Sequence, residues 1–229
     1  MSNNPYQQIL NKLEEKASLK QQVYRNTVEV FELAKSTLSG IEKQLKADYS
    51  HKDISVQIVY KENNEFEIQL KFSGDVLVIS MHSNIFTFDK ANSIYETKYV
   101  KDDESRAFFG VIYLHNFLAD SIKYNRLSDV GFLIARILVN KEQHFMVEGE
   151  GQLGFLYEDL SANVVSETIL KEIFEKAILH CLSDDLLLQP MATEKAITLN
   201  QKQSMLGNSG YPTGKQLGYQ FKAQLKQND

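Results

Sequence analysis

The chain has 229 residues, of which 43% are hydrophobic and 24% are charged. This composition is typical of a globular protein with enough apolar material for one core. No window approaches eighteen uninterrupted apolar residues, and residues 1–5 with the polar helix after them lack the basic and apolar regions of a signal peptide. The single cysteine, Cys181, excludes an internal disulfide. We therefore expect a cytoplasmic protein that does not contact membranes.

The net charge of −5 is unevenly distributed along the chain. Residues 1–50 sum to +1, residues 51–104 to −4, residues 105–189 to −5 and residues 190–229 to +3. Capture of duplex nucleic acid needs a field of Lys and Arg, which an acidic body does not offer. We therefore do not expect nucleic acid on the body, whereas the basic tail could touch RNA, DNA or an acidic protein.

An apolar repeat with a seven-residue period dominates the N-terminal part. Its members are Tyr6, Leu10, Leu13, Ala17, Tyr24, Phe31, Ala34, Leu38, Ile41 and Leu45, and only Lys20 and Thr27 interrupt it. Such a seam predicts a helix that packs lengthwise on another surface. An unbroken helix over this span is about 60 Å long, whereas a domain made from the rest should be roughly 40 Å across. The helix must therefore overhang the domain, bend, or have a partner.

Two features refine this prediction. Ile9, Val23 and Val30 lie beside the seam and widen it into a face suited to a sheet or a bundle. Gly40 lowers helix stability by about 1 kcal/mol relative to alanine, which favours a bend or an end near it. We expect residues 23–45 to pack on the protein's own sheet, so that the turns from Tyr6 to Ala17 remain for a partner.

The segment after the helix reads as an antiparallel meander. Residues 54–60 and 66–72 alternate apolar and polar side chains around a polar turn, which predicts a β-hairpin with one wet face. Residues 76–81 are apolar on both faces and predict a central strand, and residues 85–88 and 94–99 predict two further short strands.

A second block follows the acidic loop at residues 101–105. Periodicity leaves Ala107–Leu118 open between a strand and a buried helix. Residues 130–139 and 143–147 predict another hairpin, and residues 155–157 a further strand. Apolar residues at helical spacing then predict an amphipathic helix, and they are Val164, Val165, Ile169, Leu170, Ile173, Phe174, Ala177, Ile178, Cys181 and Leu182.

These elements predict an α+β fold: a long N-terminal helix packed on a mainly antiparallel sheet, a second β-hairpin block, a C-terminal amphipathic helix and a polar tail. We divide the chain into a helix for packing or assembly at 1–49, an α+β body at 50–189 and a basic tail at 190–229. The tail is too polar to form a core, and we expect it to be flexible or ordered by a partner. Its apolar side chains available for docking include Tyr211, Tyr219 and Phe221.

Asp89, Glu96 and Lys98 follow the order of acidic residues and lysine seen in many magnesium-dependent nucleases. On a strand, Glu96 and Lys98 would share one face, as the chemistry requires. The same pair is equally a surface ion pair of little energy, and the short connection from Asp89 does not suit a metal site.

A second candidate site centres on Arg136, which stands in an apolar strand and needs a partner if buried. If the hairpin loop comprises residues 140–142, Leu138 faces His144, and Arg136 shares a face with His144 and Glu148. This register would form a polar site with Arg136 as an anion clamp and His144 as a proton carrier. A two-residue loop places Arg136 with Phe145 instead and makes it a surface residue.

No cluster of Cys and His has zinc-ligand spacing, and the sequence indicates no cofactor. Our leading hypothesis is a non-enzymatic interaction or assembly module of a cytoplasmic complex. It would bind a protein partner, or a second copy, through the N-terminal helix and the tail. The alternatives are a small enzyme or ligand sensor using Arg136, His144 and Glu148, and a nuclease using Asp89, Glu96 and Lys98.

Overall fold

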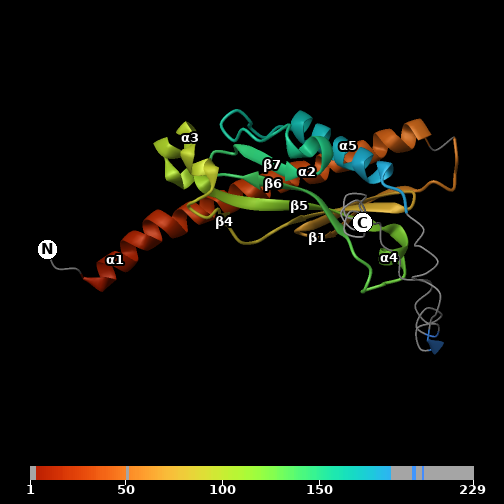
Figure 1. The fold of residues 1–229 in the computed structure, drawn as a ribbon, viewed down its shortest axis with the longest axis horizontal. Helices are drawn as coiled ribbons and strands as arrows, with labels where there is room; N and C mark the ends of the chain where they lie inside the picture. The colour runs from red at the N-terminus through yellow and green to blue at the C-terminus, as the bar shows by residue number, and fades with distance from the viewer. Residues whose placement is uncertain (1–3, 50–51, 187–197, 200–202, 204–229) are drawn as a thin grey trace, which may run out of the picture.

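The computed structural model describes residues 4–49, 52–186, 198–199 and 203. A seven-stranded antiparallel sheet forms its centre, with the strand order β1-β2-β3-β5-β6-β7 and β4 paired on β5 (Figure 1). The strands are β1 (Ile58–Asn64), β2 (Glu67–Phe72), β3 (Asp75–Met81), β4 (Phe86–Thr87), β5 (Phe108–Leu118), β6 (Phe132–Val139) and β7 (Phe145–Gly149). The expected α+β architecture, with a long helix on a mainly antiparallel sheet, is therefore confirmed.

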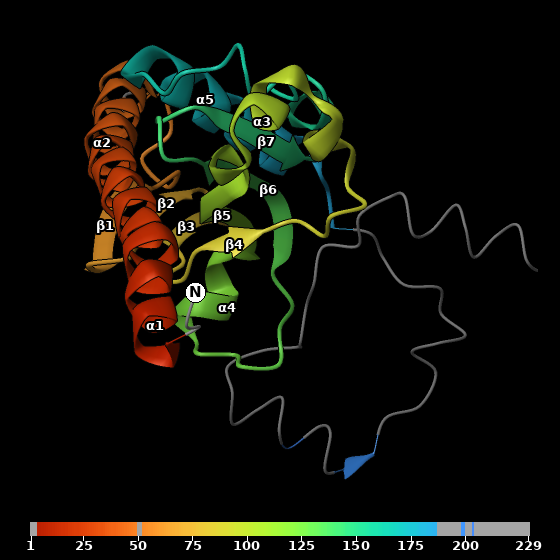
Figure 2. The same ribbon diagram turned by 90° about the vertical axis from the view of Figure 1, so that its left-hand side faces the viewer.

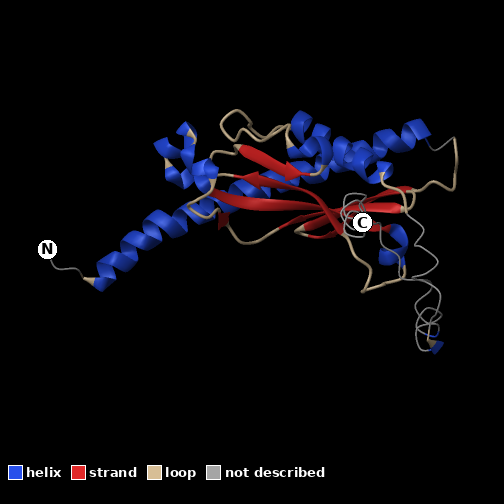
Figure 3. Cartoon of the chain, viewed as in Figure 1, coloured by secondary structure: helices blue, strands red, loops and turns tan. Residues whose placement is uncertain are grey.

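One continuous helical rod lies at the N-terminal end of the chain, and shorter helices flank the sheet (Figure 3). The rod comprises α1 (Pro5–Lys12), the π-helical turn η1 (Leu13–Ala17) and α2 (Ser18–Tyr49). The remaining helical elements are η2 (Ser93–Glu96), α3 (Lys98–Asp102), η3 (Glu104–Ala107), α4 (Ala119–Lys123), η4 (Gly151–Gly154) and α5 (Glu167–Ser183).

The main core lies between one face of the sheet and the pair α2 and α5, which also pack on each other (Figure 2). Val30, Phe31, Ala34 and Leu38 of α2 are buried there, as the seam predicted for residues 23–45. The helix continues through Gly40 to Tyr49, so the end expected as one possibility near that glycine does not occur in α2. Burial of the helix face outweighs a propensity cost of about 1 kcal/mol.

The other face of the sheet is covered only at its two ends, as far as the described residues show. A small core of Val100, Ala107, Phe109 and neighbouring side chains lies under η2, α3 and η3. Ala119 of α4 packs on the β3 residues Val76 and Val78. The sheet face between these two clusters is wetter, as expected for an antiparallel sheet with helices on one side.

Two predicted strands are wrong. Residues 94–99 form the end of η2 and the start of α3, because the side chain of Asn92 accepts from the Ile94 N–H and that of Thr97 from the Val100 N–H. Both are N-caps, which start helical turns. Residues 155–157 follow η4 without forming a strand, although the Val147 N–H donates to the carbonyl of Tyr157.

Candidate interaction surface

The rod extends beyond the sheet at its N-terminal end, as Figures 1 and 2 show. We call residues 5–17, which form α1 and η1, the overhang. The main contacts of α1 are with η1, and neither element buries any side chain. Because the overhang continues the packed helix α2, it needs no nucleation of its own, but its turns gain no stability from side-chain packing on the body and can fray.

The overhang carries an apolar stripe in spite of its exposure. Tyr6 is 65%, Ile9 56% and Leu13 53% exposed, and Leu10 is half-buried. Single exposed apolar residues are ordinary on protein surfaces, but four at helical spacing form a continuous patch. Gln8 and Asn11 lie on the opposite side of the same turns and are polar. The overhang is therefore an amphipathic helix whose apolar side does not pack on the rest of the chain.

The π turn determines where this stripe faces. Its i→i+5 pattern, with the N–H of Ser18 bonded to the carbonyl of Leu13, fits one additional residue into a turn. Side chains before the turn are thus displaced by about 100° from the path of a regular α-helix. On a helical wheel, this displacement carries the stripe further from the line of Val23, Thr27 and Val30, which face the sheet. The seam predicted as one line from Tyr6 to Leu45 is therefore divided at the π turn, and its two parts lie on different faces of the rod.

A shallow pocket lies where the rod enters the body. It has a volume of about 440 Å³ and is lined by Lys20, Gln21 and Tyr24 of α2 and by residues 83–85 of the β3–β4 connection. Tyr24 and Ile85 are half-buried at its wall. The pocket is therefore a small, partly apolar hollow on the body near the base of the overhang.

The three residues of the nuclease hypothesis do not form a site. The carboxylate of Asp89 accepts from the Ala91 N–H in a loop, Glu96 ends η2, and Lys98 begins α3, so the shared strand face is absent. All three are exposed. Within the described ranges, no group of three or more His, Cys, Asp or Glu side chains is placed to hold a metal ion.

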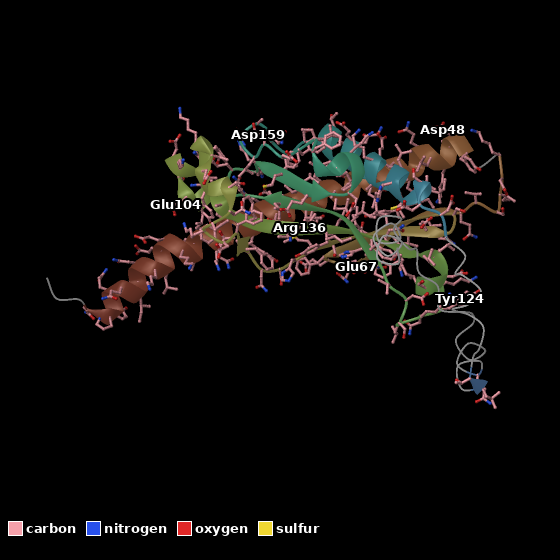
Figure 4. The ribbon with its side chains drawn as sticks, viewed as in Figure 1. Asp48, Glu67, Glu104, Tyr124, Arg136 and Asp159 are labelled. Carbon is pink, nitrogen blue, oxygen red and sulfur yellow. The ribbon has the colours of Figure 1, made fainter. Side chains whose placement is uncertain are left out.

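Arg136 and Glu148 are directly opposite each other on β6 and β7 and form an ion pair. Tyr113 on β5 is the other neighbour of Arg136, and Figure 4 shows Arg136 over the sheet, away from the overhang. Both side chains of the pair are more than a third exposed, so the pair adds little stability. The hairpin loop comprises residues 141–143, so the three-residue length is correct but its position is shifted by one residue from 140–142, and Leu138 faces Met146 rather than His144.

His144 has different partners from Arg136. Its ring stacks on Tyr99 with centroids 5.1 Å apart, and its Nδ1 lies 3.0 Å from the carbonyl oxygen of Leu160. Arg136 and Glu148 form their ion pair four residues further along the hairpin than His144. The three side chains lie on one face of the hairpin, but His144 is bonded to the Leu160 carbonyl and not to the Arg136–Glu148 pair, so we derive no ligand site from them.

A buried network around Asn140 was missed by the sequence reasoning. The Asn140 side chain accepts from the N–H groups of Glu142 and His144 and donates to the Tyr99 hydroxyl and the Arg106 carbonyl. Glu142 in turn accepts from Tyr99 at 2.6 Å and from Arg106 at 3.0 Å. The network holds the β6–β7 loop against α3 and η3. Because both polar atoms of the Asn140 side chain already have protein partners, its role is structural. An asparagine at the start of a hairpin loop was the only signal in the sequence.

Two pKa shifts follow from this network. Burial, together with the hydrogen bond to Glu142, raises the pKa of Tyr99 to about 12. Although burial opposes the change, hydrogen bonds from Tyr99 and Arg106 hold the pKa of Glu142 below its ordinary value. Neither group is tuned toward neutral pH, which a general acid or base would require.

Comparison with known proteins identifies no relative whose function could be assigned to this chain. Neither the family models, nor the curated proteins, nor the solved structures contain a match to this chain. In the described part of the chain, no helix is both long and apolar enough to cross a membrane. Tyr211, Tyr219 and Phe221 of the tail lie outside the described residues.

Proposed function

We propose that the protein is a non-enzymatic interaction module of a cytoplasmic assembly and that the overhang binds a protein partner. The observation that carries this proposal is the apolar stripe of Tyr6, Ile9, Leu10 and Leu13 on a helix that leaves the body. Burial of one such side chain stabilises a complex by roughly 1.5–3 kcal/mol before the costs of association. A partner would thus supply the side-chain packing that the overhang lacks.

Site-specific photo-crosslinking of the full chain tests this proposal. A benzophenone side chain at Ile9 lies on the stripe, and the same group at Gln8 lies on the polar side of the same turn. We expect a covalent protein adduct from position 9 only, and we expect Leu13→Asp to remove it. Equal yields at both positions, an adduct that persists with Leu13→Asp, or no adduct at either position would contradict the proposal.

A further inference from the structure

A hollow on the body lies between η2 and the loop at residues 158–161, and we call it the η2 pocket. Its volume of about 490 Å³ is within the range of small-molecule sites, which is about 300–1,000 Å³. The apolar part of its lining comes from Ile94, Met146 and Leu160, of which Ile94 and Leu160 are buried. The pocket can therefore cover a short hydrocarbon chain.

The charged groups of the η2 pocket have one sign. Among the described residues that line it, only Glu158 and Asp159 are charged, and both are exposed. Figure 4 shows Asp159 at the surface, in the loop that follows β7. The other polar side chains of the lining, such as those of Asn92 and Ser93, are neutral. The pocket therefore repels anions and attracts cations.

Asp159 keeps its negative charge at neutral pH. The hydroxyl and the N–H of Ser161 both donate to Oδ1 of Asp159, at 2.7 and 2.8 Å. These two hydrogen bonds lower the pKa of Asp159, because they favour its ionised form. Both use the same oxygen, and a carboxylate can accept further donors. The Asp159 carboxylate is thus held in place and can still accept a hydrogen bond from a ligand.

The two walls of the η2 pocket are fixed by hydrogen bonds within the chain. On one side, the Asn92 side chain accepts from the Ile94 N–H at 3.0 Å, and the Thr97 hydroxyl donates to the Ile94 carbonyl at 2.7 Å. On the other side, Nδ1 of His144 lies 3.0 Å from the Leu160 carbonyl oxygen. The hollow is therefore formed in the absence of a ligand, so that binding loses little free energy to ordering.

A metal ion does not suit this pocket, since no group of three or more acidic, His or Cys side chains is placed to hold one in the described part of the chain. We infer that the η2 pocket binds an organic cation, with its ammonium or guanidinium group at Glu158 and Asp159 and its hydrocarbon stem on Ile94, Met146 and Leu160. Lysine and arginine side chains have this chemistry, and so do free alkyl cations. This site goes beyond the proposed function, because it does not involve the overhang.

A single side chain should bind weakly. The two carboxylates are exposed, so solvent and salt screen their attraction for a cation. For a probe the size of one blocked amino acid, we expect a dissociation constant on the order of 1 mM, which rises with salt concentration.

Titration of the full chain, labelled with ¹³C at the methionine methyl groups, tests the inference by NMR. The Met146 methyl reports on the pocket, and its signal is assigned as the one that Met146→Leu removes. Nα-acetyl-arginine amide should shift this signal in a saturable manner. Nα-acetyl-citrulline amide has nearly the same shape without the charge, and it should bind at least about fivefold more weakly.

Variants of the two carboxylates test the position of the cation. Glu158→Gln and Asp159→Asn each remove one charge, and each should weaken binding of the arginine probe about two- to fivefold, with a larger loss when they are combined. Asparagine at position 159 can still accept the Ser161 hydrogen bonds. Glu150→Gln removes an exposed charge that does not line the pocket, so it should bind the probe like the wild type. Unchanged far-UV circular dichroism excludes unfolding.

n-Butylguanidinium distinguishes the two sources of the cation, because it carries the same group and stem without peptide groups. Binding as tight as that of the arginine probe assigns the pocket to free alkyl cations, whereas binding at least about threefold weaker assigns it to a basic side chain of a protein. Equal binding of the arginine and citrulline probes would overturn the inference. The same holds for unchanged binding by both charge variants, or for no saturable shift of the Met146 methyl up to about 20 mM arginine probe.

Discussion

The crossing of α2 over β5 depends on a glycine, and this gives a sharp test of the packing. Gly110 is buried directly beneath Thr27 of α2. A Cβ atom added at Gly110 would lie 1.9 Å from Oγ1 of Thr27 and 2.7 Å from both its Cβ and Cγ2. Contacts this short force the helix and the strand apart, because Cβ of Thr27 is fixed to the backbone. We therefore expect Gly110→Ala to destabilise the protein.

The magnitude follows from the overlap. Overpacking of a core costs about 1–3 kcal/mol, and a clash with a fixed Cβ atom belongs at the upper end of that range. For a protein of this size, about 3 kcal/mol lowers the melting temperature by roughly 6–12 °C. Urea unfolding followed by far-UV circular dichroism measures the change in the free energy of unfolding.

Second-site variants at Thr27 show whether the clash is the cause. Thr27→Ala removes two of the three clashing atoms, and Thr27→Gly removes all three; the helix-propensity cost of glycine is about 1 kcal/mol relative to alanine and less relative to threonine. Gly110→Ala combined with Thr27→Gly should be more stable than Gly110→Ala alone, with a coupling energy above about 1 kcal/mol. Gly40→Ala is the matched control, since nothing lies within 4 Å and alanine should stabilise α2 by about 1 kcal/mol. Strict additivity at Gly110 and Thr27, or a neutral Gly110→Ala, would refute the reasoning.

Three further predictions concern the polar groups. Asn140→Ala should lower the free energy of unfolding by about 2–4 kcal/mol in urea titrations, because it leaves the buried partners of Asn140 unsatisfied; an effect below about 1 kcal/mol would contradict the structure. The Lys141 ammonium, with the Ser105 hydroxyl, holds the pKa of Asp103 at about 2, so the stabilisation it gives is complete above about pH 4 and is lost as the pH falls toward 2. Lys141→Met should raise that pKa in a carboxyl NMR titration, and an unchanged value would show that the ion pair is not its cause. Burial lowers the pKa of His115, so the folded protein should lose stability as the pH falls below about 6.5, the unfolded value, and His115→Gln should reduce the difference in stability between pH 7.5 and 5.5.

Much of the fold follows from apolar patterning alone. The hairpin of β1 and β2 and the helix α5 have periodicities that favour one kind of element, whereas the central strand β3, apolar on both faces, is distinguished from a buried helix by its short length and flanking turn. Within the ambiguous stretch Ala107–Leu118, residues Phe108–Leu118 form a strand because they pair with β3 on one side and β6 on the other, and periodicity does not contain these tertiary contacts. The error at residues 94–99 was avoidable, since Asn92 and Thr97 are both good N-caps at the right spacing.

The candidate surface was predictable in part. The predicted helix was longer than the domain, so we expected Tyr6, Leu10 and Leu13 to lie where the helix overhangs. In the structure they lie on the overhang. The direction in which they face was not predictable, because a π turn is a choice of hydrogen-bond register rather than of residue type. The pairing of Arg136 with Glu148 was equally hidden, since it depends on a hairpin loop whose length the sequence leaves open.

The π turn also gives the rod an unusual tolerance to changes in length. Because η1 accommodates one residue more than a regular turn, deletion of Glu15 would convert it to α-helix and leave the length of the overhang nearly unchanged. The side chains before it would keep their direction, since the deleted residue contributed no rotation. A one-residue deletion within α2, at Gln21 for example, would instead turn the whole overhang by about 100°. A partner that reads the apolar stripe should therefore accept the first deletion and reject the second.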